Sequence, residues 1–278
     1  MPEGHVIHRL ARDLTERFGG VEVQVSSPQG RFAEEAAVLD GRVLEGAEAW
    51  GKHLFIGFGD LAVHIHLGLI GTFRFGPADP PTGQVRLRLS DGETAADLRG
   101  PQWCRLVTEA DRERTVAALG ADPLRAGDGP APLRAGDGTA PQRLRERLAR
   151  TRRSVASVLM DQSFYAGVGN IYRAEVLFRQ GIDPATPASA LTPGQVDAIW
   201  EDLVELMGYG VEAGRIDTVR PEHTPEAMGR PPRRDDHGGE VYVYRREGLP
   251  CLVCGTPVRA RDLEGRTLFW CPTCQPPL

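Results

Sequence analysis

The C-terminal stretch Cys251-Leu252-Val253-Cys254-Gly255 is followed, after residues 256–270, by Cys271-Pro272-Thr273-Cys274-Gln275. Two Cys-x-x-Cys pairs at this separation can bring four thiolates to one tetrahedral zinc ion. The predicted ligands are Cys251, Cys254, Cys271 and Cys274. A site closed by four cysteines has no open coordination position, so we expect one structural zinc ion in a module at residues 246–278.

Between the two cysteine pairs, the sequence predicts a β-hairpin. Alternating residues 258–261 and 266–270 flank Asp262-Leu263-Glu264-Gly265, which is typical of a turn. Arg266 should therefore lie near the tip of the hairpin.

The remaining cysteine, Cys104, is far from these pairs, and we expect a free thiol. An odd total of five cysteines argues against a secreted disulfide framework. The sequence also has no run of about 18 apolar residues and no N-terminal signal pattern. We therefore expect an intracellular, cytoplasmic and nucleoid-associated protein with no membrane partner.

Upstream of the zinc module, the pattern predicts two further kinds of structure. Residues 5–18 place apolar side chains at helical spacing, whereas residues 21–107 contain short alternating runs typical of a β-sandwich or barrel. Helical patterns return later in the chain. They cover residues 143–160, 171–180 and 192–207.

A duplicated sequence separates these regions. Pro-Leu-Arg-Ala-Gly-Asp-Gly occurs at residues 123–129 and again at 132–138, and such Gly- and Pro-rich text predicts a flexible linker. The expected organisation is α+β and multidomain. Its parts are a β-sandwich domain at 1–122, a linker at 123–141, a helical domain at 142–245 and the zinc module at 246–278.

The net charge of −5 argues mildly against a nucleic-acid partner. Residues 142–154, however, contain six arginines and one acid, Glu146. This stretch fits either a phosphate-binding patch or a solvated helix face, which is the commoner explanation of a charge run.

Lys52 is the one lysine among 33 basic residues. A lysine is a compact charge that can exchange a proton or approach a single phosphate oxygen, which arginine does less well. The residue therefore indicates either a specific need for an ammonium group or a chance survival.

Two further features have both a functional and a plain structural interpretation. Gly167-Val168-Gly169-Asn170 precedes a predicted helix, where backbone N–H groups can bind phosphate, although most such turns are only turns. If Met1 is removed, Pro2 presents a secondary α-amine, and α-amino groups titrate near about 8, so an uncharged nucleophile is accessible. The alternative for Pro2 and Glu3 is a disordered tail.

Together, Met-Pro-Glu-Gly at the start, Gly51-Lys52-His53-Leu54, Gly167-Val168-Gly169-Asn170-Ile171-Tyr172 and residues 265–275 resemble the formamidopyrimidine-DNA glycosylase and endonuclease VIII family. The resemblance spans the chain in the correct order. It implies a β-sandwich domain, a helix-two-turn-helix domain and a zinc-finger hairpin, with damaged double-stranded DNA held between domains by a monomer.

The resemblance also implies roles for individual residues. Pro2 attacks the sugar C1′ and forms a Schiff base that leads to β,δ-elimination, Glu3 manages protons, and Lys52 contacts a phosphate near the lesion. Asn170 and Arg266 grip the phosphates that flank the flipped nucleotide. Glu175 matches an acidic position whose role is left open.

The sequence departs from its relatives at two places. They commonly have a second glutamate shortly after Glu3, where this chain has His5-Val6. Leu69 occupies the position of the apolar residue that enters the gap left by the flipped base. The second departure is in segment 99–104, the partner of this apolar residue, which lacks the Arg-Arg-Phe pattern of relatives. Gap filling and opposite-base preference are therefore not predicted from the relatives.

The expected function is base excision repair by a bifunctional DNA glycosylase and abasic-site lyase. The Met-Pro-Glu-Gly start resembles the endonuclease VIII branch, which implies oxidised pyrimidines as substrates. The alternatives are an 8-oxoguanine-type glycosylase and a non-catalytic, zinc-dependent DNA-binding protein on the same scaffold.

Overall fold

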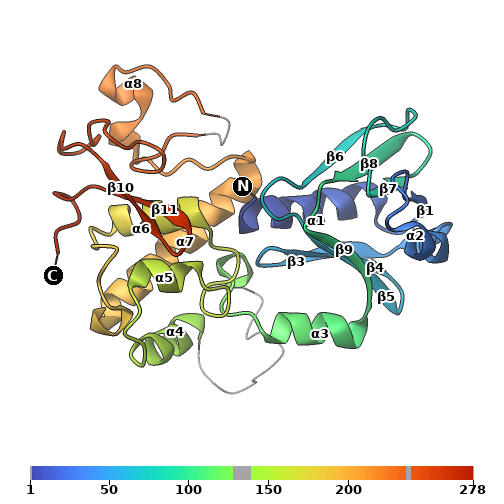
Figure 1. Ribbon diagram of the computed structural model, residues 1–278, viewed down its shortest axis with the longest axis horizontal. Coiled ribbons are helices and arrows are strands. Elements are labelled where there is room, and N and C mark those ends of the chain that lie inside the picture. Colours follow the sequence, from blue (N-terminus) through green and yellow to red (C-terminus); the bar gives the residue numbers. More distant parts are fainter. Residues whose placement is uncertain (1, 128–138, 236–238, 278) are drawn as a thin grey trace. The chain divides into compact units, whose positions relative to one another are not determined.

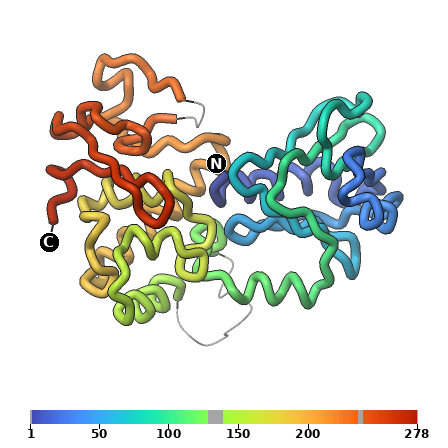
Figure 2. Tube along the Cα trace, viewed as in Figure 1, coloured from blue at the N-terminus to red at the C-terminus, as the bar shows by residue number. Residues whose placement is uncertain are grey.

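The computed structural model describes residues 2–127, 139–235 and 239–277 (Figure 1, Figure 2). The chain folds as two compact units, the first ending at Ala118 and the second beginning at Leu119. The second copy of the duplicated sequence, and with it most of the expected flexible linker, lies outside the described residues.

The N-terminal unit begins with helix α1 (Gly4–Phe18), whose apolar face is the predicted one: Ile7, Leu10, Leu14 and Phe18 are buried. Two short helices, α2 (Ala33–Leu39) and α3 (Glu109–Ala117), were not predicted. The strands of this unit are β1 (Val21–Ser26), β2 (Arg42–Leu44), β3 (Gly46–Trp50), β4 (His53–Phe58), β5 (Leu61–His66), β6 (Thr72–Pro77), β7 (Leu87–Ser90), β8 (Thr94–Arg99) and β9 (Trp103–Thr108).

These strands form two antiparallel sheets, which confirms the β-sandwich prediction. In the part of the unit that the structure describes, one sheet has the order β2-β1-β7-β8-β6 and the other β3-β4-β5-β9. Both sheets and α1 contribute to one hydrophobic core, in which Leu14, Leu54, Val63, Leu89 and Leu98 are fully buried.

One end of the β3-β4-β5-β9 sheet gathers three connections. Because β4 is antiparallel to both β3 and β5, the turn at residues 51–52 and the segment 67–71 lie at the same end. The pairing of His66 with Trp103 brings residues 100–102 there as well. The last turns of α1 are fixed near the opposite end of β3 by the Ala47 N–H, which donates to Thr15 Oγ1 at 2.8 Å. Figure 1 shows the start of α1 at the end that carries these connections.

A histidine cluster covers the face of this sheet that points away from the core. His53 Nδ1 lies 2.9 Å from His64 Nε2. The His66 ring stacks on Trp103 and Phe55 stacks on His64, each with ring centroids 4.5 Å apart. Burial, followed by the neighbouring charges, lowers the pKa of His53 to about 3 and that of His64 to about 4.

This cluster predicts a loss of stability in mild acid. In the unfolded chain these histidines titrate near 6.5, so between pH 6.5 and 4 the unfolded state binds more protons than the folded state. The contribution to stability is therefore complete above pH 6.5 and decreases as the pH falls. Urea unfolding of the protein between pH 7.5 and 4.5 should show this decrease. A His53→Gln/His64→Gln variant should have a flatter profile, and an unchanged slope would contradict the assignment.

The C-terminal unit is helical and ends in a strand pair. Its elements are η1 (Pro123–Arg125), α4 (Ala140–Leu148), α5 (Val155–Met160), α6 (Asn170–Arg179), η2 (Ala188–Ala190), α7 (Pro193–Ala213), η3 (Pro221–His223), α8 (Pro225–Met228), β10 (Arg259–Leu263) and β11 (Arg266–Trp270). Helix α7 begins as predicted, with the capping box of Thr192 and Gln195. It continues past the expected end at residue 207.

The prediction of one helical stretch over residues 143–160 is wrong in its middle. Helix α4 ends at Leu148, and α5 begins only at Val155. Ser154 caps the new helix, since its Oγ accepts a hydrogen bond from Ser157 N at 3.2 Å. None of the helices in the described ranges is both long and apolar enough to cross a membrane.

Candidate functional site

Pro2 and Glu3 lie directly before and at the start of helix α1, and neither is fully exposed. Glu3 is the N-cap of α1 and has no exposed surface, while Pro2 is half-buried. The Glu3 carbonyl accepts a hydrogen bond from Val6 N at 3.0 Å. A buried carboxyl group directly after Pro2 means that this segment does not extend into solvent as a tail.

Lys52 lies in the two-residue turn between β3 and β4, closed by the pairing of Trp50 with His53. Its charge is close to the histidine cluster, because it adds to burial in lowering the pKa of both His53 and His66. The turn lies at the sheet end where α1 begins (Figure 1). The structure thus places Pro2, Glu3 and Lys52 at one end of the same unit.

Leu69 lies on the segment 67–71 that joins β5 to β6, at the same end of the sheet. The segment is closed by a hydrogen bond from Gly71 N to Leu67 O of 3.1 Å. Leu69 is 62% exposed, and its neighbour Ile70, which the sequence analysis did not single out, is 82% exposed.

Asn170 begins α6 in the C-terminal unit, immediately after the glycines of the predicted anion-binding turn. Its side chain is buried, and Nδ2 donates to the carbonyl of Thr267 on β11 at 2.9 Å. Arg173, which is 1% exposed, donates to Asn170 Oδ1. The start of α6 therefore holds the hairpin residue next to Arg266, which brings the two predicted phosphate-binding residues together.

The hairpin turn consists of Glu264 and Gly265, with φ angles of 54° and 73°. Two consecutive positive φ angles are those of the turn that matches the twist of a tight hairpin. The turn is shorter than predicted, since Asp262 and Leu263 belong to β10. Ser157 Oγ donates to Glu264 Oε1 at 2.9 Å, so α5 also holds the tip beside Arg266.

Glu175 has a structural role that the sequence did not reveal. Its carboxylate is fully buried and accepts hydrogen bonds from the backbone N–H groups of Tyr242, Val243 and Tyr244 at 2.7–2.9 Å. Thr218 Oγ1 donates to the same carboxylate. Helix α6 is thereby joined to the chain that leads into the zinc module.

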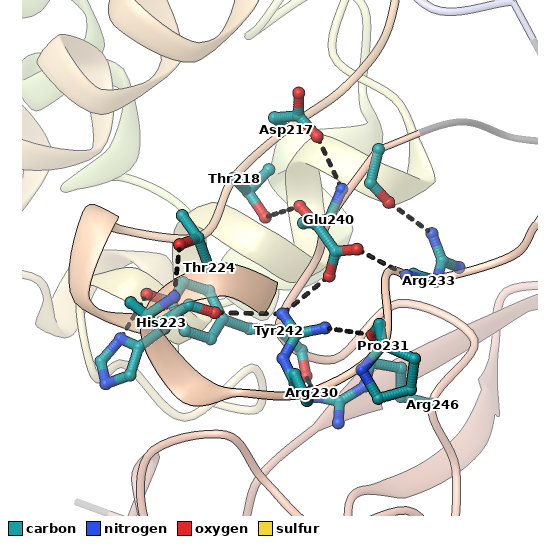
Figure 3. A network of polar contacts seen from close by, with 12 residues as sticks. Asp217, Thr218, His223, Thr224, Arg230, Pro231, Arg233, Glu240, Tyr242 and Arg246 are labelled. Carbon is teal, nitrogen blue, oxygen red and sulfur yellow. Dashed lines mark hydrogen bonds and ion pairs between the residues drawn. The ribbon is translucent and has the colours of Figure 1, made fainter.

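A polar network centred on Glu240 extends this connection (Figure 3). The Glu240 carboxylate pairs with Arg230 at 2.7 Å and accepts from Arg233 N at 2.5 Å. Its backbone N–H donates to Asp217 Oδ1 at 2.6 Å. A cavity of about 920 Å³, lined by residues of α6, α7 and segments 215–233 and 239–240, lies along this network. No sequence pattern predicted the network, because it joins residues by tertiary contact.

The four cysteines of the C-terminal module form a compact cluster. Their Sγ atoms all lie within 4.8 Å of one another, with separations of 3.8 Å between Cys251 and Cys274 and 3.5 Å between Cys254 and Cys271. A tetrahedron with Zn–S bonds of about 2.3 Å has edges of about 3.8 Å. The residues therefore fit one structural zinc ion, as predicted. Cys104 is a buried free thiol, and burial raises its pKa to about 12.

The second cysteine pair is also connected to the helical part of the unit by hydrogen bonds. Gln275 Oε1 accepts a hydrogen bond from Cys271 N at 2.9 Å, and Gln275 Nε2 donates to the carbonyl of Ile182 at 2.9 Å. Gln275 is 1% exposed. The chain after α6 thus supports the second cysteine pair directly.

Comparison with known proteins matches the chain to three family models. These are the formamidopyrimidine-DNA glycosylase N-terminal domain at residues 1–102, its H2TH domain at 129–220 and a zinc finger found in FPG and IleRS at 248–277. Endonuclease 8 1 of Mycobacterium bovis is 47% identical, with 99% of this chain and 100% of that protein covered. The chain belongs to the formamidopyrimidine-DNA glycosylase and endonuclease VIII family of DNA glycosylases.

Other members of the family are less similar. The formamidopyrimidine-DNA glycosylase of Aromatoleum aromaticum is 32% identical over 99% of this chain and 98% of that protein. The Fpg of Lactococcus lactis, solved in a complex with DNA that contains an abasic site, superposes with a TM-score of 0.77. It is 19% identical and covers 99% of this chain and 100% of that chain, which shows the shared fold.

The structural zinc predicts a selective effect of metal removal. Because metal binding and local folding are coupled, chelation should disorder the cysteine knuckles, displace Arg266 and abolish DNA binding, while the N-terminal unit stays folded. Metal analysis should give one zinc per chain. Calorimetry should show an unchanged transition of the N-terminal unit after chelation. A Cys271→Ser protein that binds DNA with full affinity would contradict this prediction.

Proposed function

We propose that this protein is a bifunctional DNA glycosylase and abasic-site lyase that removes oxidised pyrimidines from double-stranded DNA in base excision repair. The observation that carries the proposal is the placement of Pro2 beside the fully buried Glu3, at the sheet end that also carries Lys52. An amine held in this way loses little entropy when it meets a substrate carbon.

The reaction begins after Met1 is removed and the damaged nucleotide is flipped out of the duplex. The Pro2 nitrogen attacks C1′, and the base leaves with the electron pair of the glycosidic bond and accepts a proton. Opening of the sugar ring gives an iminium ion between Pro2 and C1′. Glu3, next to the amine, exchanges protons with the ring oxygen and the leaving base.

The same iminium ion explains the lyase step. It withdraws electrons from C1′ and so acidifies the C2′ proton, whose loss expels the 3′ phosphate in β-elimination. Loss of the C4′ proton then expels the 5′ phosphate in δ-elimination, and hydrolysis of the iminium ion releases Pro2. Lys52, as a compact cation, stabilises a phosphate oxygen near the lesion.

DNA contacts in the C-terminal unit come from the start of α6 and the hairpin tip. The helix N-terminus attracts phosphate, and Arg266 adds a charged, forked donor beside it. The hydrogen bonds of Asn170 to Thr267 and of Ser157 to Glu264 fix Arg266 relative to the helix. Leu69 enters the gap left by the flipped base, and the protein acts as a monomer.

The nucleophile can be tested by trapping. Sodium borohydride should reduce the iminium ion and leave a stable protein–DNA adduct at Pro2. Pro2→Gly should lower the trapping rate by roughly tenfold or more, which corresponds to a loss of about 1.4 kcal/mol in the barrier. Peptide mapping locates the adduct. Retention of Met1 in the active protein, or an undiminished adduct at Lys52, would refute the assignment.

The substrate class can be tested with a panel of lesions. The similarity to Endonuclease 8 1 over the full length supports the endonuclease VIII branch. The resemblance to that branch implies oxidised pyrimidines as substrates. Duplexes with thymine glycol, 5-hydroxycytosine or an abasic site should be cut faster than 8-oxoguanine opposite cytosine under single-turnover conditions. Much faster excision of 8-oxoguanine would assign the chain to the other branch and overturn this part of the proposal.

A further inference from the structure

An acidic residue lies two positions before the arginine that is proposed to bind phosphate. Glu264 and Gly265 form the turn between β10 and β11, and the pairing of Leu263 with Arg266 closes it. The Glu264 side chain is exposed. A carboxylate at this place repels the DNA backbone, so its charge is unfavourable for a hairpin that binds phosphate.

The backbone conformation of Glu264 is also unfavourable for a glutamate. Its φ angle of 54° lies in the left-handed region, where glycine, asparagine and aspartate are the usual residues of such a turn. Other residues are strained there and persist only where the surrounding structure holds them. The Glu264 side chain should therefore make a contact that offsets both its charge and its backbone conformation.

That contact is with helix α5. Ser157 is 4% exposed, and its Oγ donates a hydrogen bond to Glu264 Oε1 at 2.9 Å. The Ser157 hydroxyl in turn accepts a hydrogen bond from Ser154 Oγ at 3.0 Å, so two hydroxyl groups form a chain that ends at the carboxylate. Hydrogen bonds in such a chain strengthen one another, and a bond to a charged acceptor is stronger than one between neutral groups.

Helix α5 is itself fixed to the rest of the C-terminal unit. Val155 N donates to Thr186 O at 2.8 Å, and Ala188 N donates to Arg153 O at 2.8 Å. These bonds hold the start of the helix against the connection between α6 and α7. The carboxylate of Glu264 thus joins the hairpin tip to a fixed part of the unit.

We infer that Glu264 is a positioning residue for DNA binding, with two opposed effects. Its hydrogen bond with Ser157 fixes the turn and so presets Arg266 for one phosphate beside the lesion, which matters in the complex with damaged DNA. Its negative charge lowers the attraction of the tip to any DNA, and salt weakens this second effect. The inference rests on the proposed function, because it assumes that Arg266 binds phosphate.

Two substitutions of Glu264 separate these effects. Glu264→Gln keeps an oxygen that can accept from Ser157 but removes the charge, whereas Glu264→Ala removes both. At low salt, both variants should bind undamaged duplex about threefold more tightly than wild type, and this gain should vanish at high salt. On a duplex with a tetrahydrofuran abasic-site analogue, Glu264→Gln should show the same gain, whereas Glu264→Ala should bind about fivefold more weakly than Glu264→Gln.

Substitution of Ser157 gives an independent test. Ser157→Ala keeps the charge, so it should weaken binding to the abasic-site duplex about fivefold and leave binding to undamaged duplex unchanged. A Ser157→Ala/Glu264→Ala double variant should bind no more weakly than Glu264→Ala, because both changes remove the same hydrogen bond. In cleavage of abasic-site DNA, Ser157→Ala should raise the protein concentration that gives the half-maximal rate and leave the rate at saturation within about twofold. Glu201→Gln, at an exposed acidic residue of α7, is the matched control and should change neither affinity.

Three outcomes would overturn the inference while the proposed function stands. They are equal affinities of Glu264→Gln and Glu264→Ala for the abasic-site duplex, additive losses in the double variant, and a loss for Ser157→Ala that is equal on damaged and undamaged duplex. Zinc content and circular dichroism check the folding of each variant, and Glu264→Gly, which suits the positive φ, replaces Glu264→Ala if that variant does not fold. Failure of the proposed function looks different, because wild-type protein would then neither cleave abasic-site DNA nor form a borohydride adduct.

Discussion

The buried carboxylate of Glu175 is the interaction on which the arrangement of the C-terminal unit depends. A charged group without exposed surface is costly unless its hydrogen-bonding capacity is used, and here three backbone N–H groups and a threonine hydroxyl use it. If the acceptor were removed, the buried donors would each cost about 1–3 kcal/mol. The same helix also holds the hairpin through Asn170 and the segment before Glu240 through Arg179, which donates to Thr218 O at 2.6 Å. Helix α6 therefore positions both the hairpin of β10 and β11 and the segment that leads into the zinc module.

Local patterns in the sequence were sufficient where a structure depends on neighbouring residues. The cysteine spacing predicts the zinc cluster, and Thr192-Pro193 with Gln195 predicts the start of α7, because each encodes its own geometry. The sequence did not predict the break between α4 and α5, because arginines have high helix propensity. The pattern of apolar residues also does not show where the helix is interrupted. The partners of Glu175 lie more than 40 residues away along the chain, and only tertiary structure shows them.

The candidate site shows the same division between local and tertiary information. The sequence singles out Lys52 by composition and by the motif around it. Its neighbours in the histidine cluster lie on β4 and β5, and the spacing of residues in the sequence does not show that these histidines lie together. Asn170 was expected to face phosphate, whereas its amide donates to Thr267. It can still contribute to phosphate binding through its place at the helix start and by fixing the hairpin beside Arg266.

The arginine-rich stretch at residues 142–154 does not compensate for the negative net charge of the chain. Arg145 bonds Asp197 at 2.8 Å, Arg153 bonds Asp161 at 2.6 Å, and Arg147 lies over the ring of Phe164. These three arginines stabilise the unit itself, so neither a uniform phosphate patch nor a purely solvated face describes the stretch. A chain that uses its arginines internally has fewer of them for nonspecific attraction to the DNA backbone. Under the proposed function, binding to DNA then depends more on directed groups, namely the N-terminus of α6 and Arg266 beside a hairpin turn held from two helices. Their contributions depend on geometry more than on net charge.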